Sequence, residues 1–173
     1  GDKVFKERNT FIAISGSLGK LYTGTHDTAF QKSQLKIDLF NDTRADIKYI
    51  LRGENRMNSF IGYVSPDLLD GLNISINSIS QSTGNGESSA FNYSKNDIKA
   101  SFAIEQNIKG YDGKRFSVML PLGEIDLGLI YQSSRKLSSG KSFSGHVVSM
   151  KRKISDKGVL LSSIIMLMTK TCR

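Results

Sequence analysis

Hydrophobic and polar residues alternate along much of this chain with a period of two. From Ile125 to Gln132, apolar side chains recur at every second position, and Asp126, Gly128 and Gln132 lie between them. The segments 72–77 and 98–105 repeat this pattern. Because successive side chains of a β-strand point to opposite faces, the alternation predicts strands with one apolar face.

Turn-forming residues divide the chain into about ten such strands. Short turns are expected at 16–19, 65–71, 94–97, 121–124 and 155–158, and longer polar stretches at 26–55, 81–88, 106–113 and 134–142. Connections that alternate between short and long are typical of a transmembrane β-barrel. A soluble or surface-exposed β-sandwich that binds a glycan or a protein is the alternative, because its strands alternate too.

Composition and charge narrow the classes of function. The chain has 24 Lys and Arg against 16 Asp and Glu, but the bases are scattered and no nucleic-acid-binding motif accompanies them, so we expect no nucleic-acid partner. No run of about 18 apolar residues is present, which excludes a transmembrane helix. The only histidines, His26 and His146, lack a nucleophile elbow or zinc spacing, so no enzyme, cofactor or metal is predicted. His146 is expected to face a lumen or its rim.

Three stretches share a family's order and spacing of residues. Residues 8–24 read as a strand, a glycine turn at Gly16 to Gly19 and a second strand; residues 54–66 contain Arg56, Asn58-Ser59, Tyr63 and Ser65-Pro66; and Asp70-Gly71-Leu72 follows. From Asn9 to Ile79 the chain thereby resembles the general diffusion porins of Gram-negative bacteria.

The resemblance implies an all-β fold, part of a 16-stranded antiparallel transmembrane barrel in the outer membrane. It implies contact with outer-membrane lipid, passage of small hydrophilic solutes and ions, and a homotrimer at full length. Side chains such as Ile98, Phe102, Leu127 and Leu129 should then face hydrocarbon, while their alternate neighbours meet water.

The resemblance also implies that the loop 26–55 folds into the lumen and narrows it. Its acids Asp38, Asp42, Asp46 and Glu54 would face the pore, with Arg56 on the opposite wall. Thr25 stands where the family usually has a wall arginine, which should make that point less attractive to anions, and Ala29 stands where proline is usual. The loop holds five acids and five bases, so its formal charge is neutral and its sequence predicts no ion preference.

The two ends of the chain suggest a longer protein. Gly1-Asp2-Lys3 is not followed by an apolar signal segment, so either the start of a precursor was removed or, as we expect, the chain begins within a longer sequence. We expect residues 1–163 to belong to the barrel. Residues 164–173 lose the alternation, and a shifted reading frame from the Ser163 codon can encode a strand end and a loop, so we expect an out-of-frame or non-native tail.

Overall fold

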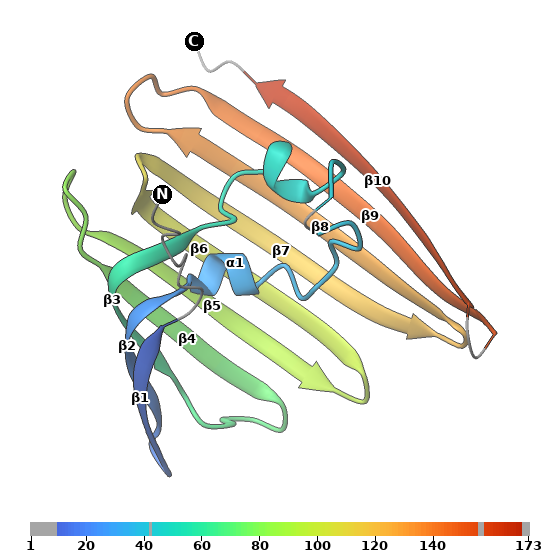
Figure 1. The fold of residues 1–173 in the computed structure, drawn as a ribbon, viewed down its shortest axis with the longest axis horizontal. Helices are drawn as coiled ribbons and strands as arrows, with labels where there is room; N and C mark the ends of the chain where they lie inside the picture. Colours follow the sequence, from blue (N-terminus) through green and yellow to red (C-terminus); the bar gives the residue numbers. More distant parts are fainter. Residues whose placement is uncertain (1–9, 42, 156–157, 171–173) are drawn as a thin grey trace, which may run out of the picture.

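The computed structural model describes residues 10–41, 43–155 and 158–170, and in this part of the chain ten strands form one antiparallel sheet (Figure 1). The strands lie side by side in chain order, each paired with the next. Their bounds are β1 Phe11–Gly16, β2 Gly19–Asp27, β3 Arg56–Val64, β4 Leu72–Ile79, β5 Gly86–Lys95, β6 Ile98–Ile108, β7 Tyr111–Leu122, β8 Ile125–Lys136, β9 Ser142–Ser155 and β10 Gly158–Lys170.

Local turn chemistry explains the tight hairpins. Between β5 and β6, Lys95 pairs with Ile98, and the two residues that connect them, Asn96 and Asp97, have φ angles of 50° and 62°. Two successive positive φ angles match the right-handed twist of the flanking strands, and Asn and Asp tolerate this conformation best after glycine. The hairpin register therefore follows from the sequence.

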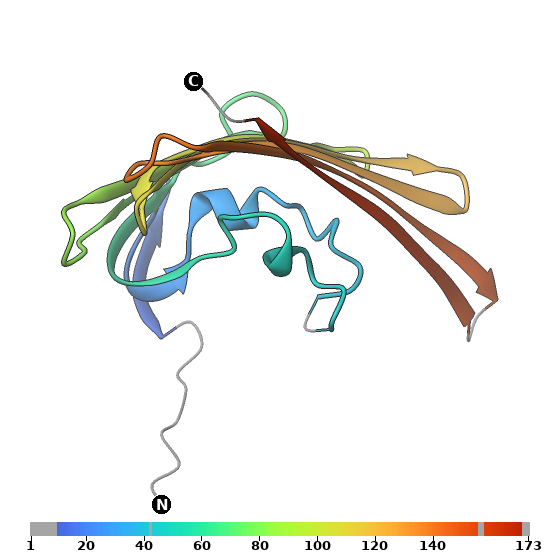
Figure 2. The same ribbon diagram turned by 90° about the horizontal axis from the view of Figure 1, so that it is seen from above.

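The sheet curves into an arch, and its convex face is the apolar one (Figure 2). Phe102 and Leu129 are 41% and 39% exposed, Ile98 is also exposed and Leu127 is half-buried. Polar side chains at alternate positions are buried on the concave face; they include Ser75, Asn77, Ser88, Ser101, Glu105, Arg115, Gln132 and Ser134. Large apolar residues outside and polar residues inside invert the arrangement of a soluble domain.

This polarity and topology decide between the two predicted architectures. A sandwich buries its apolar strand faces between two sheets, whereas the described residues form a single sheet whose apolar face is uncovered. The partial-barrel fold is confirmed, and the sandwich alternative is wrong for this part of the chain. No helix among the described residues is long and apolar enough to cross a membrane.

Three local expectations are corrected. The stretch 106–113 is not a long loop, because β6 and β7 extend almost to each other and only Lys109 and Gly110, both at positive φ, connect them. His146 does not face the lumen: its ring lies 5.0 Å from that of Tyr131, which is exposed on the convex face. Strand β10 continues to Lys170 in register with β9, whereas the barrel was expected to end at Ser163.

Candidate functional site

The segment between β2 and β3, residues 28–55, lies against the concave face of the sheet (Figure 2). We call it the inner loop. It contains one short helix, α1 (Ala29–Lys32), and one 3₁₀ turn, η1 (Ile47–Tyr49). The predicted loop began two residues earlier, but His26 and Asp27 belong to β2. The loop therefore lies on the concave side of the sheet (Figure 2).

Polar side chains of the sheet hold the first turn of α1. The helix cap Thr28 accepts a hydrogen bond from the Gln31 backbone N–H at 3.1 Å. The N–H groups of Ala29 and Phe30 have no partner within the helix; they donate to Asn77 Oδ1 on β4 and to Ser88 Oγ on β5. A proline at position 29 would remove one of these donors. The departure from the family pattern at Ala29 therefore adds a contact between loop and wall.

Two apolar side chains of the inner loop fit against glycines of the wall. Phe30 and Ile37 are both 0% exposed. A Cβ atom placed on Gly113 of β7 would lie 3.0 Å from the Phe30 ring, and one placed on Gly128 of β8 would lie 2.7 Å from Ile37. The absence of a side chain at these two inward positions lets the loop approach the sheet backbone.

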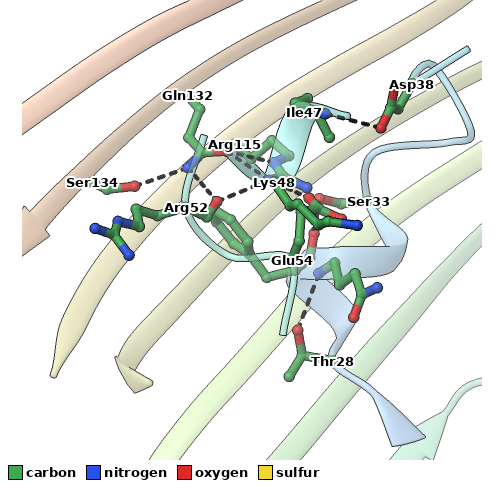
Figure 3. Close-up of polar contacts among 12 residues, drawn as sticks. Thr28, Ser33, Asp38, Ile47, Lys48, Arg52, Glu54, Arg115, Gln132 and Ser134 are labelled. Carbon is green, nitrogen blue, oxygen red and sulfur yellow. Dashed lines mark hydrogen bonds and ion pairs between the residues drawn. The ribbon is translucent and has the colours of Figure 1, made fainter. Parts of the chain in front are cut away.

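Arg115 of β7 is the centre of the contact between loop and wall (Figure 3). The residue is fully buried, and its guanidinium lies 2.8 Å from the Glu54 carboxylate. It also donates to the backbone carbonyls of Phe30 at 3.1 Å and Arg52 at 3.2 Å, and to Gln132 Oε1 at 2.7 and 2.9 Å. Its charge lies over the Phe30 ring, 4.5 Å from the centroid. One cation thus joins both arms of the loop to two strands.

Gln132 of β8 completes the network. Its Oε1 accepts from Arg115, while its Nε2 donates to the Arg52 carbonyl at 2.6 Å and to Ser134 Oγ at 2.9 Å. Neither Arg115 nor Gln132 was predicted as a site residue from the sequence. A signal was present, because both are polar residues at inward positions of adjacent strands, and the register places them opposite each other.

Two loop acids that were predicted from the sequence, Asp38 and Asp46, have different hydrogen-bond partners. Asp38 accepts from the backbone N–H groups of Phe40 and Ile47 at 3.0 and 3.1 Å, and so closes the loop on itself. Asp46 is 2% exposed; it accepts from the Lys48 N–H at 2.8 Å and pairs with the Lys48 ammonium at 2.7 Å. Both carboxylates hold loop backbone.

The remaining predicted site residues are Glu54, Arg56, Thr25 and Asp42. Glu54 reaches the wall at Arg115. Arg56 is the first residue of β3 and pairs with Asp27 of β2 at 2.8 Å. Thr25 is in β2, where its hydroxyl donates to Asn58 Oδ1 at 3.2 Å. Asp42 lies outside the described residues.

Burial sets the electrostatics of the loop carboxylates. Loss of water raises the pKa of Glu54 above its ordinary value, although the neighbouring Arg115 opposes the shift. Burial also raises the pKa of Asp38, against the effect of its two backbone donors. Glu105 of β6 is 1% exposed, and neither of its carboxylate oxygens has a hydrogen-bond partner within the described part of the chain. Holding the loop therefore places several acids in poorly solvated positions.

A cavity of about 640 Å³ runs along the inner loop. Charged side chains line it from both arms of the loop and from the strands; they are Asp27, Lys32, Lys36, Asp46, Lys48, Glu54, Arg56 and Lys99. No group of three or more His, Cys, Asp or Glu side chains that could hold a metal ion occurs among the described residues. The site is a charged, water-accessible hollow beside a fixed loop.

Solved structures of similar shape are porins. An anion-selective porin from Comamonas acidovorans has a TM-score of 0.79 and 16% sequence identity, with 94% of this chain and 57% of that chain covered. The OmpF porin of Salmonella typhi, solved in complex with daunomycin, has a TM-score of 0.76 and 12% identity, with 94% of this chain and 60% of that chain covered. The chain therefore spans under two thirds of the length of either porin. No family model and no curated protein matches it.

We expect Arg115→Ala to release the inner loop. The substitution leaves the buried Glu54 carboxylate and two backbone carbonyls without their cationic donor, and breaking a buried pair costs about 3–5 kcal/mol. Urea unfolding of the refolded protein should show this loss, and trypsin should cleave faster at Arg44 and Lys48. Lys114→Ala, one residue away on the exposed face, is the matched control. Equal losses in the two variants would contradict a specific role for Arg115.

The raised pKa of Glu54 predicts how stability depends on pH. Between the ordinary pKa and the raised one, the folded protein binds more protons than the unfolded chain, so the contribution of Glu54 falls as pH rises through the raised pKa. Unfolding free energies should show the wild type losing stability relative to Glu54→Gln as the pH rises above about 4, the ordinary pKa of a glutamate. Glu124→Gln, at an exposed surface pair, should show no such trend. A relative gain for the wild type would mean that Arg115 outweighs burial.

Proposed function

We propose that this chain forms part of the wall of an outer-membrane channel through which small hydrophilic solutes and ions diffuse passively. The observation that carries the proposal is the inverted polarity of the sheet, together with a loop fixed on its concave side. An apolar convex face suits contact with hydrocarbon, and a polar concave face suits contact with water. Catalysis has no part in this function.

The inner loop would narrow the channel. It lies on the face that becomes the lumen when the sheet closes, and its contacts with Asn77, Ser88, Arg115 and Gln132 hold it there. A rigid constriction lined by charges filters solutes by size and by charge. Arg56, Asp46 and Glu54 line the hollow beside the loop, so we assign them to the constriction. Asp38 stabilises the constriction from within the loop. Asp42, and Thr25 at the position of the family's wall arginine, stay predicted constriction residues.

Closure of the barrel would need strands beyond the ten described here. Strands β1 and β10 each pair with one neighbour, so the described sheet has two open edges. Unpaired backbone groups in hydrocarbon cost several kcal/mol each, which makes an open sheet unsuitable in a bilayer. We propose that a longer form of the protein closes a barrel of about 16 strands. Like the porin family it would be a homotrimer embedded in outer-membrane lipid.

Channel activity can be tested in planar lipid bilayers. The full-length protein that carries these residues should give stepwise conductance, whereas residues 1–173 alone should give none because their sheet cannot close. An absence of steps from correctly refolded full-length protein, or solubility without detergent, would contradict the proposed function.

Lipid contact of the convex face predicts a depth-dependent cost for charge. Phe116 lies near the middle of β7, and Leu122 lies at its end; both are exposed on the convex face. In lipid vesicles, Phe116→Lys should lower the unfolding free energy by about 2–4 kcal/mol and Leu122→Lys by about 0–1 kcal/mol. Equal effects at the two positions would argue against a face buried in hydrocarbon.

A further inference from the structure

Acids and bases around the inner loop differ in how many have an ion-pair partner, although residues 26–55 are formally neutral. The cavity along the loop is lined by three acids and five bases. Each of the three acids has a base in contact with it. Asp27 pairs with Arg56 at 2.8 Å, and Asp46 pairs with Lys48 at 2.7 Å.

The third acid, Glu54, is neutralised from the wall side. Its partner Arg115 is fully buried under the loop, at 2.8 Å, and does not line the cavity. Arg115 therefore cancels the charge of Glu54 without itself facing solute. The three acidic charges of the cavity are all matched by these contacts.

Three bases of the cavity remain unmatched. Lys32 and Lys36 on the loop and Lys99 on β6 are exposed, and none of them forms an ion pair within the described part of the chain. Lys32 lies over the Tyr22 ring, 5.3 Å from its centroid, which orients the ammonium but does not neutralise it. The hollow thus carries excess positive charge.

The chemistry of a folded loop explains this asymmetry. Backbone N–H groups that have no partner need acceptors, and carboxylates supply them, as Asp38 and Asp46 do here. An ammonium group accepts no hydrogen bond, so lysines cannot serve the N–H groups and extend into water instead. Folding thus uses the carboxylates as hydrogen-bond acceptors and leaves the lysine ammonium groups exposed to water.

An adjoining hollow of about 200 Å³ extends this excess of positive charge along the wall. Lys36 and Lys99 line it as well, together with Lys151 of β9 and a single acid, Asp126 of β8. Asp126 and Lys151 are register partners on neighbouring strands. Lys36 and Lys99 therefore border both hollows, and no acid of the described residues forms an ion pair with either.

We propose that the inner loop makes the channel favour small anions, with Lys32, Lys36 and Lys99 as the residues that attract them. The inference rests on the proposed channel function and adds the solute class: chloride, inorganic phosphate and small carboxylates. A lumen lined by one sign of charge raises the local concentration of the opposite ion. The attraction weakens with salt, because the Debye length falls from about 10 Å at 0.1 M to about 3 Å at 1 M.

Reversal potentials in a KCl gradient test the proposal on the full-length protein in planar bilayers. The wild type should pass chloride in preference to potassium. The double variant Lys32→Gln/Lys36→Gln should lower the chloride-to-potassium permeability ratio at least about twofold at low salt, and by less near 1 M. Lys99→Gln, on the wall, should shift the ratio in the same direction without any change to the loop.

The control removes the same two charges elsewhere. Lys114→Gln/Lys141→Gln changes exposed residues that line neither hollow, and its permeability ratio should equal that of the wild type. A wild type that conducts but favours potassium, or a ratio that the cavity variants leave unchanged, would overturn the anion preference while the channel function stands. A wild type that does not conduct would overturn both. Stepwise conductance of each variant establishes that it folds.

Discussion

The position of the inner loop depends on one buried cation, Arg115. A guanidinium has five N–H donors in a fixed plane; here they serve Gln132 and the backbone carbonyls of Phe30 and Arg52, while its charge pairs with Glu54. Removing water from an arginine is unfavourable unless nearly all its donors are satisfied. The loop supplies those acceptors from both of its arms. Docking of the loop and burial of Arg115 therefore require each other, and the charged hollow exists because the loop is held in place.

The contact between the inner loop and the wall depends on the polar side chains of the sheet's concave face. On the concave face of an ordinary antiparallel sheet a loop would meet mainly apolar side chains, whereas here it meets Ser, Asn, Gln and Arg as well as the apolar side chains of Ala90, Ala103, Ile130 and Val147. Polar wall residues provide partners for loop backbone that would otherwise be buried without hydrogen bonds, as Asn77 and Ser88 do for the start of α1. Apolar contacts supplement these hydrogen bonds: Phe30 and Ile37 fit at Gly113 and Gly128, and both belong to buried apolar clusters that include wall residues. Hydrogen bonds and apolar packing therefore fix the loop together.

Much of the fold could be predicted from local sequence, and less of the site. Period-two alternation in 98–105 and 125–132 located strands β6 and β8, and Asn96-Asp97 located a tight turn. The polar stretch 106–113 was wrongly predicted to be a long loop, because polar residues are also expected on a strand that lines water. Asp46, Glu54 and Arg56, predicted from the sequence as constriction residues, line the hollow beside the loop, but their partners were not predicted. Arg115 is 85 residues from Phe30 along the chain, and such a contact leaves no local pattern.

The sequence by itself determined the strands, the tight turns, the place of the long loop and the existence of one apolar face per strand, because these depend on the period of the backbone and on the conformations that Gly, Asn and Asp allow. Only the tertiary structure decided which face turns outward, since curvature and the docked loop set it. The tertiary structure also decided which charged side chains remain exposed to water. The five acids and five bases of residues 26–55 sum to no formal charge, but hydrogen bonds and ion pairs within the loop and with the sheet occupy carboxylates and leave lysines exposed to water.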